Sequence, residues 1–104
     1  MVGIESVQMG SRARITLQGI INEQGAKEFK KLVGALNFDQ VREVLIDCRG
    51  MQHIGSAGIG KMLLLYKKIA CTGGSLSVVN LVGQNFDLFC ELKLNSLFTI
   101  TRAH

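Results

Sequence analysis

The sequence predicts a single α/β domain, residues 1–104, built as an open β-sheet with parallel strand pairs and helices packed on it. Two observations support this prediction. Strand-like and helix-like hydrophobic periods alternate along the chain, and the connections between them are short. A chain of 104 residues can bury one hydrophobic core but not a core plus a separate catalytic lobe. No repeat or internal linker interrupts the pattern.

The first half of the chain contains two predicted strands and one predicted helix. Residues 12–19 alternate apolar and polar side chains, which is the period of a half-buried strand. Residues 21–37 change to helical spacing with one apolar stripe, and Asn22 is the expected cap at the start. Residues 42–48 have the continuous apolar centre of a fully covered strand. We expect residues 49–55 to be a short linker.

The second half repeats the alternation. A helix is predicted from about residue 56 to 70, where a glycine pair ends it, and a strand over residues 75–81. A helix over residues 84–94 and a short strand over 96–100 complete the pattern. Right-handed crossovers place the strand-to-helix loops at the carboxyl edge of the sheet, where such folds carry their sites.

Charge and hydropathy narrow the class of function. The net charge is +4, but the densest basic cluster, residues 27–31, is interrupted by Glu28 and Phe29. With one tyrosine and no tryptophan to stack on bases, we expect no direct nucleic-acid binding, and the mild positive surface suits an acidic protein partner. No apolar run is long enough for a membrane span or typical of a signal peptide, so a cytoplasmic protein is expected.

Metal and disulfide chemistry is not expected, and no cofactor is predicted. Cys48, Cys71 and Cys90 are odd in number and have no CxxC spacing, which argues against a disulfide framework and a zinc site. Their apolar sequence context predicts reduced cysteines in or near the core. His53 and His104 are the only histidines.

The stretch from Gly55 to Lys61 suggests two kinds of site. Gly55, Gly60 and Lys61 match most of a phosphate-binding loop, G-x-x-x-x-G-K-[ST]. Met62, however, occupies the position of the hydroxyl that binds magnesium, and the helical apolar stripe places Gly60 and Lys61 inside a helix. A small nucleotide-binding enzyme that uses Gly55 to Lys61 therefore remains a remote alternative, and we expect no enzymatic activity.

Ser56 at the predicted helix start suggests a switch. Unpaired backbone amides and the positive end of the helix dipole favour an anion there, so a phosphate on Ser56 would be tolerated by the helix and would repel a docked partner. The competing interpretation is that Ser56 is simply an N-cap. Gly58 and Gly60 in the first turns lower helix propensity, which indicates close packing on the sheet or close approach of another chain.

Residues 44–81, VLIDCRGMQHIGSAGIGKMLLLYKKIACTGGSLSVVNL, resemble the central segment of STAS domains, the family of bacterial anti-sigma factor antagonists. The shared order is a strand ending in Asp, a linker, an Asp-Ser-Ser/Thr-Gly-Leu-Gly turn that opens a helix, then Gly-Gly and a strand ending near Asn. ITLQGIINEQGAKEFKKLV and FCELKLNSLFTI resemble the flanking segments of the family. The resemblance implies a single STAS domain with a STAS-type open mixed β-sheet.

The resemblance also implies a function. Such a module captures an anti-sigma factor, often itself a serine kinase, and so frees a sigma factor. Phosphorylation of the hydroxyl at the helix start ends the binding, and a PP2C-type phosphatase resets it. These steps constitute partner switching, a form of signal transduction that regulates transcription.

The family's turn carries over with two departures. Ser56 matches its first Ser, Gly55 replaces its usual Asp, and Ala57 stands at the usual phosphoacceptor, so Ser56 is the phosphorylation candidate. Asp47 is the strand-end acid. The expected partner-binding residues are Asn22, Asp47, His53, Gly55, Ser56, Ala57, Gly58 and Lys61.

One alternative function remains open from the sequence. The chain could be a non-phosphorylated binding module, as a STAS subunit of a lipid-transport or stress-signalling complex.

The oligomeric state is also left open. We expect a monomer or a weak dimer, because the early strand could pair at an exposed sheet edge.

Overall fold

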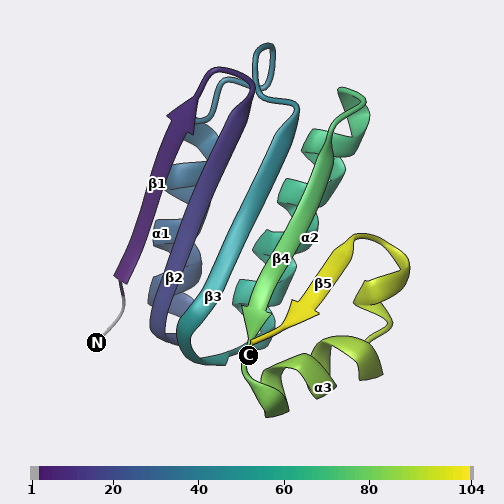
Figure 1. The fold of residues 1–104 in the computed structure, drawn as a ribbon. Helices are drawn as coiled ribbons and strands as arrows, with labels where there is room; N and C mark the ends of the chain where they lie inside the picture. The colour runs from purple at the N-terminus through teal and green to yellow at the C-terminus, as the bar shows by residue number, and fades with distance from the viewer. Residues whose placement is uncertain (1–2, 104) are drawn as a thin grey trace.

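Five strands form one sheet in the order β1-β2-β3-β4-β5 in the computed structural model, which describes residues 3–103 (Figure 1). β1 runs antiparallel to β2, and the other neighbouring pairs are parallel. The predicted open α/β sheet is therefore confirmed. In chain order the elements are β1 (Gly3–Met9), β2 (Arg12–Ile21), α1 (Glu23–Ala35), β3 (Glu43–Ile54), α2 (Ser56–Cys71), β4 (Ser75–Leu81), α3 (Gly83–Glu91), the 3₁₀ helix η1 (Leu94–Ser96) and β5 (Thr99–Arg102).

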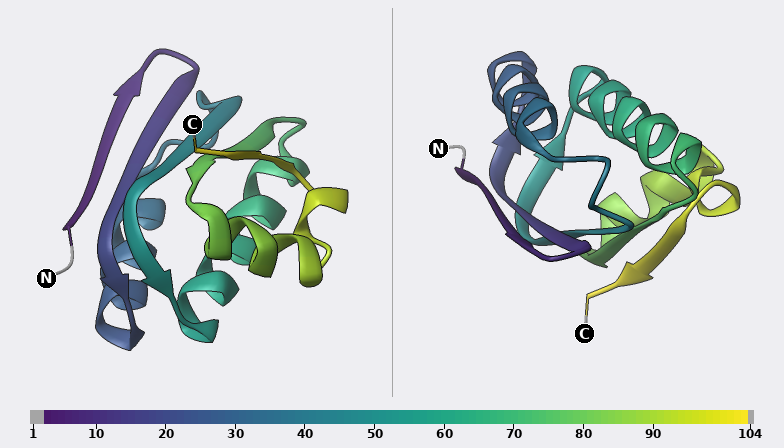
Figure 2. Two further views of the ribbon diagram at one scale, coloured as in Figure 1. Left: turned by 60° about the horizontal axis from the view of Figure 1, so that its bottom comes forward. Right: turned by 90° about the horizontal axis from the view of Figure 1, so that it is seen from above.

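Helices α1 and α2 cover one face of the sheet, and the other face is open (Figure 2). Helix α3 lies at the end of the sheet where β4 finishes, next to β5. Because side chains alternate across a strand, every second residue of the central strands points into the helix layer. The largest fully buried side chains are Phe29, Phe89, Ile15, Leu17, Ile21, Ile46, Met51, Ile54, Met62, Leu65, Ile69 and Leu81.

Strand β1 was not predicted from the sequence. It forms a hairpin with β2 through a turn in which Gly10 adopts a φ of +61°. None of its seven residues is buried. An edge strand that contributes so little to the core carries only a weak apolar alternation, which explains why the pattern did not indicate it.

The predicted linker over residues 49–55 is wrong, because β3 continues to Ile54. Pairing between β3 and β4 ends at Asp47, opposite Val79. Beyond that point β3 still pairs with β2, from Gly50 to Ile54, across two register shifts. Residues 50–54 therefore remain a strand although they pair with β2 only and no longer with β4. A strand with a neighbour on one side only does not need a continuous apolar sequence, and this is why the pattern predicted a linker.

The C-terminal elements are also displaced from their predicted bounds. Helix α3 ends at Glu91, and Lys93 then adopts the left-handed conformation with φ of 59°, which no helix can continue through. The short helix η1 follows, and the last strand spans Thr99–Arg102 rather than 96–100.

Candidate functional site

The N-termini of α1 and α2 lie side by side at the carboxyl edge of the sheet. Their preceding strands end in a matched pair, because Ile21 of β2 is the register partner of Ile54 of β3. The backbone amide of Gly55 donates to the carbonyl of Ile21 at 3.0 Å. The two N-cap residues that follow these strands, Asn22 and Gly55, therefore lie at neighbouring helix starts, and Ser56 comes directly after Gly55.

Asn22 caps helix α1, as the sequence predicted. Its side-chain oxygen accepts a hydrogen bond from the backbone amide of Gly25 at 3.1 Å. Glu23 supplies a negative charge in the first turn, where the helix dipole favours it. At the start of α1, the Asn22 side chain therefore satisfies a free backbone amide, and the charge of Glu23 complements the helix dipole.

The start of α2 is different. Gly55 is its N-cap, so the interpretation of Ser56 as an N-cap is wrong. No side-chain hydrogen bond caps this helix, and its first turn contains no acidic residue. Ser56 is the first helical residue and is exposed. An exposed hydroxyl therefore lies where free backbone amides and the helix dipole favour a negative charge.

Gly58 and Gly60, which the sequence treated alike, have different surroundings. A Cβ atom on Gly58 would lie 2.8 Å from Ile54 Cγ1 and 3.0 Å from Ile21 Cγ2, so Gly58 lets α2 pack closely on the strands. A Cβ on Gly60 would meet nothing within 4 Å. Gly60 and Lys61 are helical, as predicted, so the residues from Gly55 to Lys61 do not form a phosphate-binding loop.

The remaining candidates divide between the edge and the body of the sheet. His53 is exposed, and Ala57 and Lys61 are half-buried near the start of α2. Asp47 lies in the middle of β3, seven residues before its end at Ile54. It therefore does not join the group at the carboxyl edge.

Asp47 instead forms the centre of a polar cluster on the open face. Its Oδ1 atom accepts hydrogen bonds from the backbone amide of Arg49 at 3.0 Å and from Nδ2 of Asn80 at 3.1 Å. Its Oδ2 atom pairs with the guanidinium of Arg14. The Arg49 guanidinium in turn donates to Oδ1 of Asn80 at 3.1 Å. Asn80 adopts a φ of 61°, which asparagine accepts more readily than most residues.

This environment sets the ionisation of the cluster. Burial raises the pKa of the Asp47 carboxyl, but hydrogen bonds from Arg49, Asn80 and Arg14, with the charge of Arg14, outweigh it, so the pKa lies below the usual 3.8. Burial, and secondarily the charge of Asp47, raises the pKa of the adjacent Cys48 thiol to about 12. Asp47 is thus ionised and fully partnered at neutral pH.

Asn85 of α3 is a structural residue that the sequence did not reveal. It is 2% exposed, and its Nδ2 atom lies 3.3 Å from the carbonyls of both Met51 and Gln52. These carbonyls belong to the part of β3 that no longer pairs with β4. An asparagine among apolar helix positions was the available signal, because a buried amide needs polar partners.

The cysteines only partly match their prediction. Cys48 is buried and Cys90 is half-buried, but Cys71, at the end of α2, is exposed. Residues 3–103 contain no group of three or more His, Cys, Asp or Glu side chains that could hold a metal ion. Within the same residues, no helix combines the length and apolarity that a membrane crossing requires.

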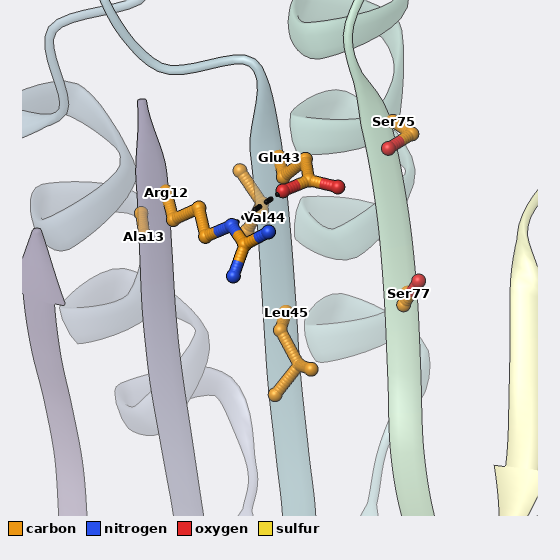
Figure 3. Close-up of a pocket in the computed structure, with 7 residues that line it drawn as sticks. All are labelled: Arg12, Ala13, Glu43, Val44, Leu45, Ser75 and Ser77. Atoms are coloured by element: carbon orange, nitrogen blue, oxygen red, sulfur yellow. Dashed lines mark hydrogen bonds and ion pairs between the residues drawn. The ribbon is translucent and has the colours of Figure 1, made fainter. Parts of the chain in front are cut away.

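Two hollows lie on the open face, away from the helix starts. One, of about 280 Å³, is lined by parts of β2, β3 and β4 and crossed by the ion pair between Arg12 and Glu43 (Figure 3). The other, of about 350 Å³, lies against β1 and includes Val7 and Met9. Neither is lined by Ser56. The candidate site at the helix starts therefore lies outside both of these hollows.

Comparison with known proteins identifies the family. The sequence model of the STAS domain family matches residues 5–104 of this chain. The chain belongs to the STAS family. No curated protein sequence matches it.

Several solved structures share this fold at low sequence identity. An anti-sigma factor antagonist from Mycobacterium paratuberculosis is 19% identical with a TM-score of 0.83, over 97% of this chain and 86% of that one. An anti-sigma-factor antagonist (STAS) domain protein from Planctomyces limnophilus is 16% identical with a TM-score of 0.75, over 97% and 91%. The Bacillus cell fate determinant SpoIIAA in its phosphorylated form is 14% identical with a TM-score of 0.74, over 96% and 90%.

Proposed function

We propose that this single STAS domain is a cytoplasmic anti-sigma factor antagonist, which binds an anti-sigma factor and thereby frees a sigma factor. The observation that carries the proposal is the exposed Ser56 at the uncapped start of α2, beside the start of α1. The structural neighbours support it, because several are anti-sigma factor antagonists with the same fold. The docking surface comprises Asn22, His53, Gly55, Ser56, Ala57 and Lys61.

Phosphorylation of Ser56 is the proposed switch. A phosphate adds almost two negative charges where the dipole of α2 and its free amides favour them, so the helix remains folded. The same charges would repel an acidic partner surface that docks on this edge. One structural neighbour, SpoIIAA, is known in a phosphorylated form. The kinase would be the anti-sigma factor itself or another serine kinase, and a PP2C-type phosphatase would reverse the reaction.

The charge of the helix layer supports an acidic partner. Helices α1 and α2 carry six lysines and two glutamates, so the net +4 of the whole chain equals the charge of these two helices. The ion pairs among the described residues involve arginines of β2 and β5, and none involves these lysines. A positive layer with unpaired lysines favours encounter with a negative surface. The lysines are Lys27, Lys30, Lys31, Lys61, Lys67 and Lys68.

Binding and phosphorylation are tested with an anti-sigma factor of the serine-kinase type encoded beside this gene. Mass spectrometry after incubation with the kinase and ATP should find phosphate on Ser56. Isothermal titration should show binding by the native chain and by Ser56→Ala, and a loss of at least tenfold in affinity for Ser56→Asp. Ser11→Asp is the matched control, because it adds the same charge in the exposed β1–β2 turn. It should bind like the native chain.

A non-phosphorylated binding module is the second candidate, favoured by Ala57 at the usual acceptor position and Gly55 in place of Asp. In that case the chain would be a STAS subunit of a lipid-transport or stress-signalling complex. An unmodified Ser56, together with equal binding by Ser56→Asp and the native chain, would reject the switch and favour this candidate. Absence of any binding to the anti-sigma factor would reject antagonism itself.

A further inference from the structure

The two edges of the sheet are protected to different degrees. At one edge, β5 has only four residues, and its pairing with β4 is interrupted by a register shift. Its Arg102 forms an ion pair with Asp87 and stacks 4.6 Å from the ring centre of Phe86, and α3 and η1 pack beside it. Short length, a charged side chain and a covering helix are devices by which proteins prevent strand addition.

Strand β1, at the other edge, is longer and more regular, although α1 packs beside it. It has seven residues and pairs with β2 in an unbroken register from Gly3 to Met9. It contains no proline, no lysine and no bulge, and Glu5 is its only charged residue. Because β1 uses only one side of its backbone for β2, its other side presents unpaired amide and carbonyl groups along its length.

The most exposed large apolar side chains also belong to β1. Met9 is 77% exposed and Val7 is 59% exposed, more than any other exposed large hydrophobic residue among the described residues. Both point to the open face, where they line the hollow of about 350 Å³ together with Leu45. The free backbone and the exposed apolar side chains therefore coincide on one strand.

We propose that β1 pairs antiparallel with β1 of a second copy, around a two-fold axis perpendicular to the sheet. The two five-stranded sheets then form one continuous sheet of ten strands. The axis keeps the open faces of both copies on the same side, so Val7 and Met9 of both copies lie on one face of the ten-stranded sheet, and with all seven residues paired Val7 of one copy lies opposite Glu5 of the other. This inference is independent of the proposed function, because α1 separates β1 from α2, whose start carries Ser56 (Figure 1).

The size of the contact predicts a weak dimer. Seven residues of strand span about 23 Å, and the molecule measures 23 Å along its shortest principal axis. A contact as deep as that axis covers on the order of 500 Å² on each copy, so the total is at most about 1,000 Å², which is near the lower limit for specific interfaces. Dissociation in the micromolar range or weaker is expected, so monomer and dimer should both be present as the concentration is varied.

The test is sedimentation velocity of the native chain and two variants over a wide concentration range. The first variant is Val7→Glu with Met9→Glu. Val7 and Met9 lie opposite Arg14 and Arg12 of β2, so the new carboxylates are favourable within one copy, but they crowd like charges between two copies. The control is Leu92→Glu with Leu97→Glu, which removes two exposed leucines and adds the same charge near the β5 edge.

The proposal expects the average mass of the native chain to rise from 11.4 kDa towards twice that value with concentration. The control should behave in the same way, whereas the β1 variant should remain at the monomer mass with an unchanged circular dichroism spectrum. A native chain that stays at 11.4 kDa throughout overturns the proposal. So does a β1 variant that associates as the native chain does, or a control that is equally impaired.

A second measurement needs no variant and so does not depend on how the substitutions fold. Hydrogen exchange of the native chain, at low and high concentration, should show added protection of amides in β1 and unchanged protection in β5. Equal protection of β1 at both concentrations, while the mass increases, would show that another surface associates and would overturn the proposal.

Discussion

Asp47 and Ser56, nine residues apart on β3 and the start of α2, show how differently two polar side chains of one segment are used. Asp47 has 9% of its surface exposed and receives hydrogen bonds from Arg49, Asn80 and Arg14. Ser56 is exposed at a helix start that no side chain caps. The carboxylate of Asp47 is satisfied within the molecule, whereas the hydroxyl of Ser56 lies exposed at a helix start without a side-chain cap.

The difference indicates which polar residues belong to the fold and which are available for function. Where β3 and β4 separate after Asp47, the chain supplies Asn80 and Asn85 to replace the lost strand pairing. At the carboxyl edge, Asn22 completes α1 but no residue does the same for α2. The four predictions below test this contrast, beginning with the largest effect.

Replacement of Asp47 should destabilise the fold, whereas replacement of Ser56 should not. Asp47→Ala removes the carboxylate that accepts from three donors and leaves Nδ2 of Asn80 and the Arg49 backbone amide without their acceptor, so the free energy of unfolding should fall by about 2 to 3 kcal/mol. Ser56→Ala should stay within about 0.5 kcal/mol of the native value. Urea denaturation followed by circular dichroism measures both. Equal stability of the two variants would contradict the contrast.

Gly58 and Gly60 give a matched pair within α2 itself. Gly58→Ala brings a methyl group within 3 Å of Ile54, so it should destabilise the fold by about 1 to 3 kcal/mol. Gly60→Ala has open space and should stabilise the helix by roughly 0.5 to 1 kcal/mol. Thermal melting compares the two changes directly. A stabilising Gly58→Ala would mean that α2 does not sit against the strands as closely as described.

The sequence predicted the helices and central strands well because their apolar side chains face the core between the sheet and the layer of α1 and α2 (Figure 2). It predicted Asn22 as a cap and α2 within one residue of its end. It missed β1, whose side chains are mostly exposed, and the extension of β3 to Ile54, which pairs on one side only. The family resemblance grouped Asp47 with Ser56, but distance along a strand and hydrogen-bond satisfaction are properties of the three-dimensional arrangement.

Acid should weaken the Asp47 cluster and leave the helix start unaffected. The folded pKa of Asp47 lies below 3.8, so its contribution to stability is complete above that pH and is lost as the pH falls through the lower folded value. Unfolding free energies measured from pH 6 to pH 2 should therefore decline more steeply for the native chain than for Asp47→Asn. Parallel curves for the two proteins would show that Asp47 has no depressed pKa.

The smallest expected effect is a change in the rate at which the Cys48 thiol is labelled, which tests the polar cluster around Asp47 locally. Cys48, next to Asp47, is buried, and this burial raises the pKa of its thiol to about 12, so the thiol stays protonated at neutral pH. Exposed Cys71 should react with iodoacetamide in the native chain, whereas Cys48 should react only after denaturation. Because the hydrogen bonds of Asp47 hold β3 to β4 beside Cys48, Asp47→Ala should accelerate labelling of Cys48 and leave that of Cys71 unchanged. Rapid labelling of Cys48 in the native chain would show that this part of β3 opens readily, and that the polar cluster does not close it.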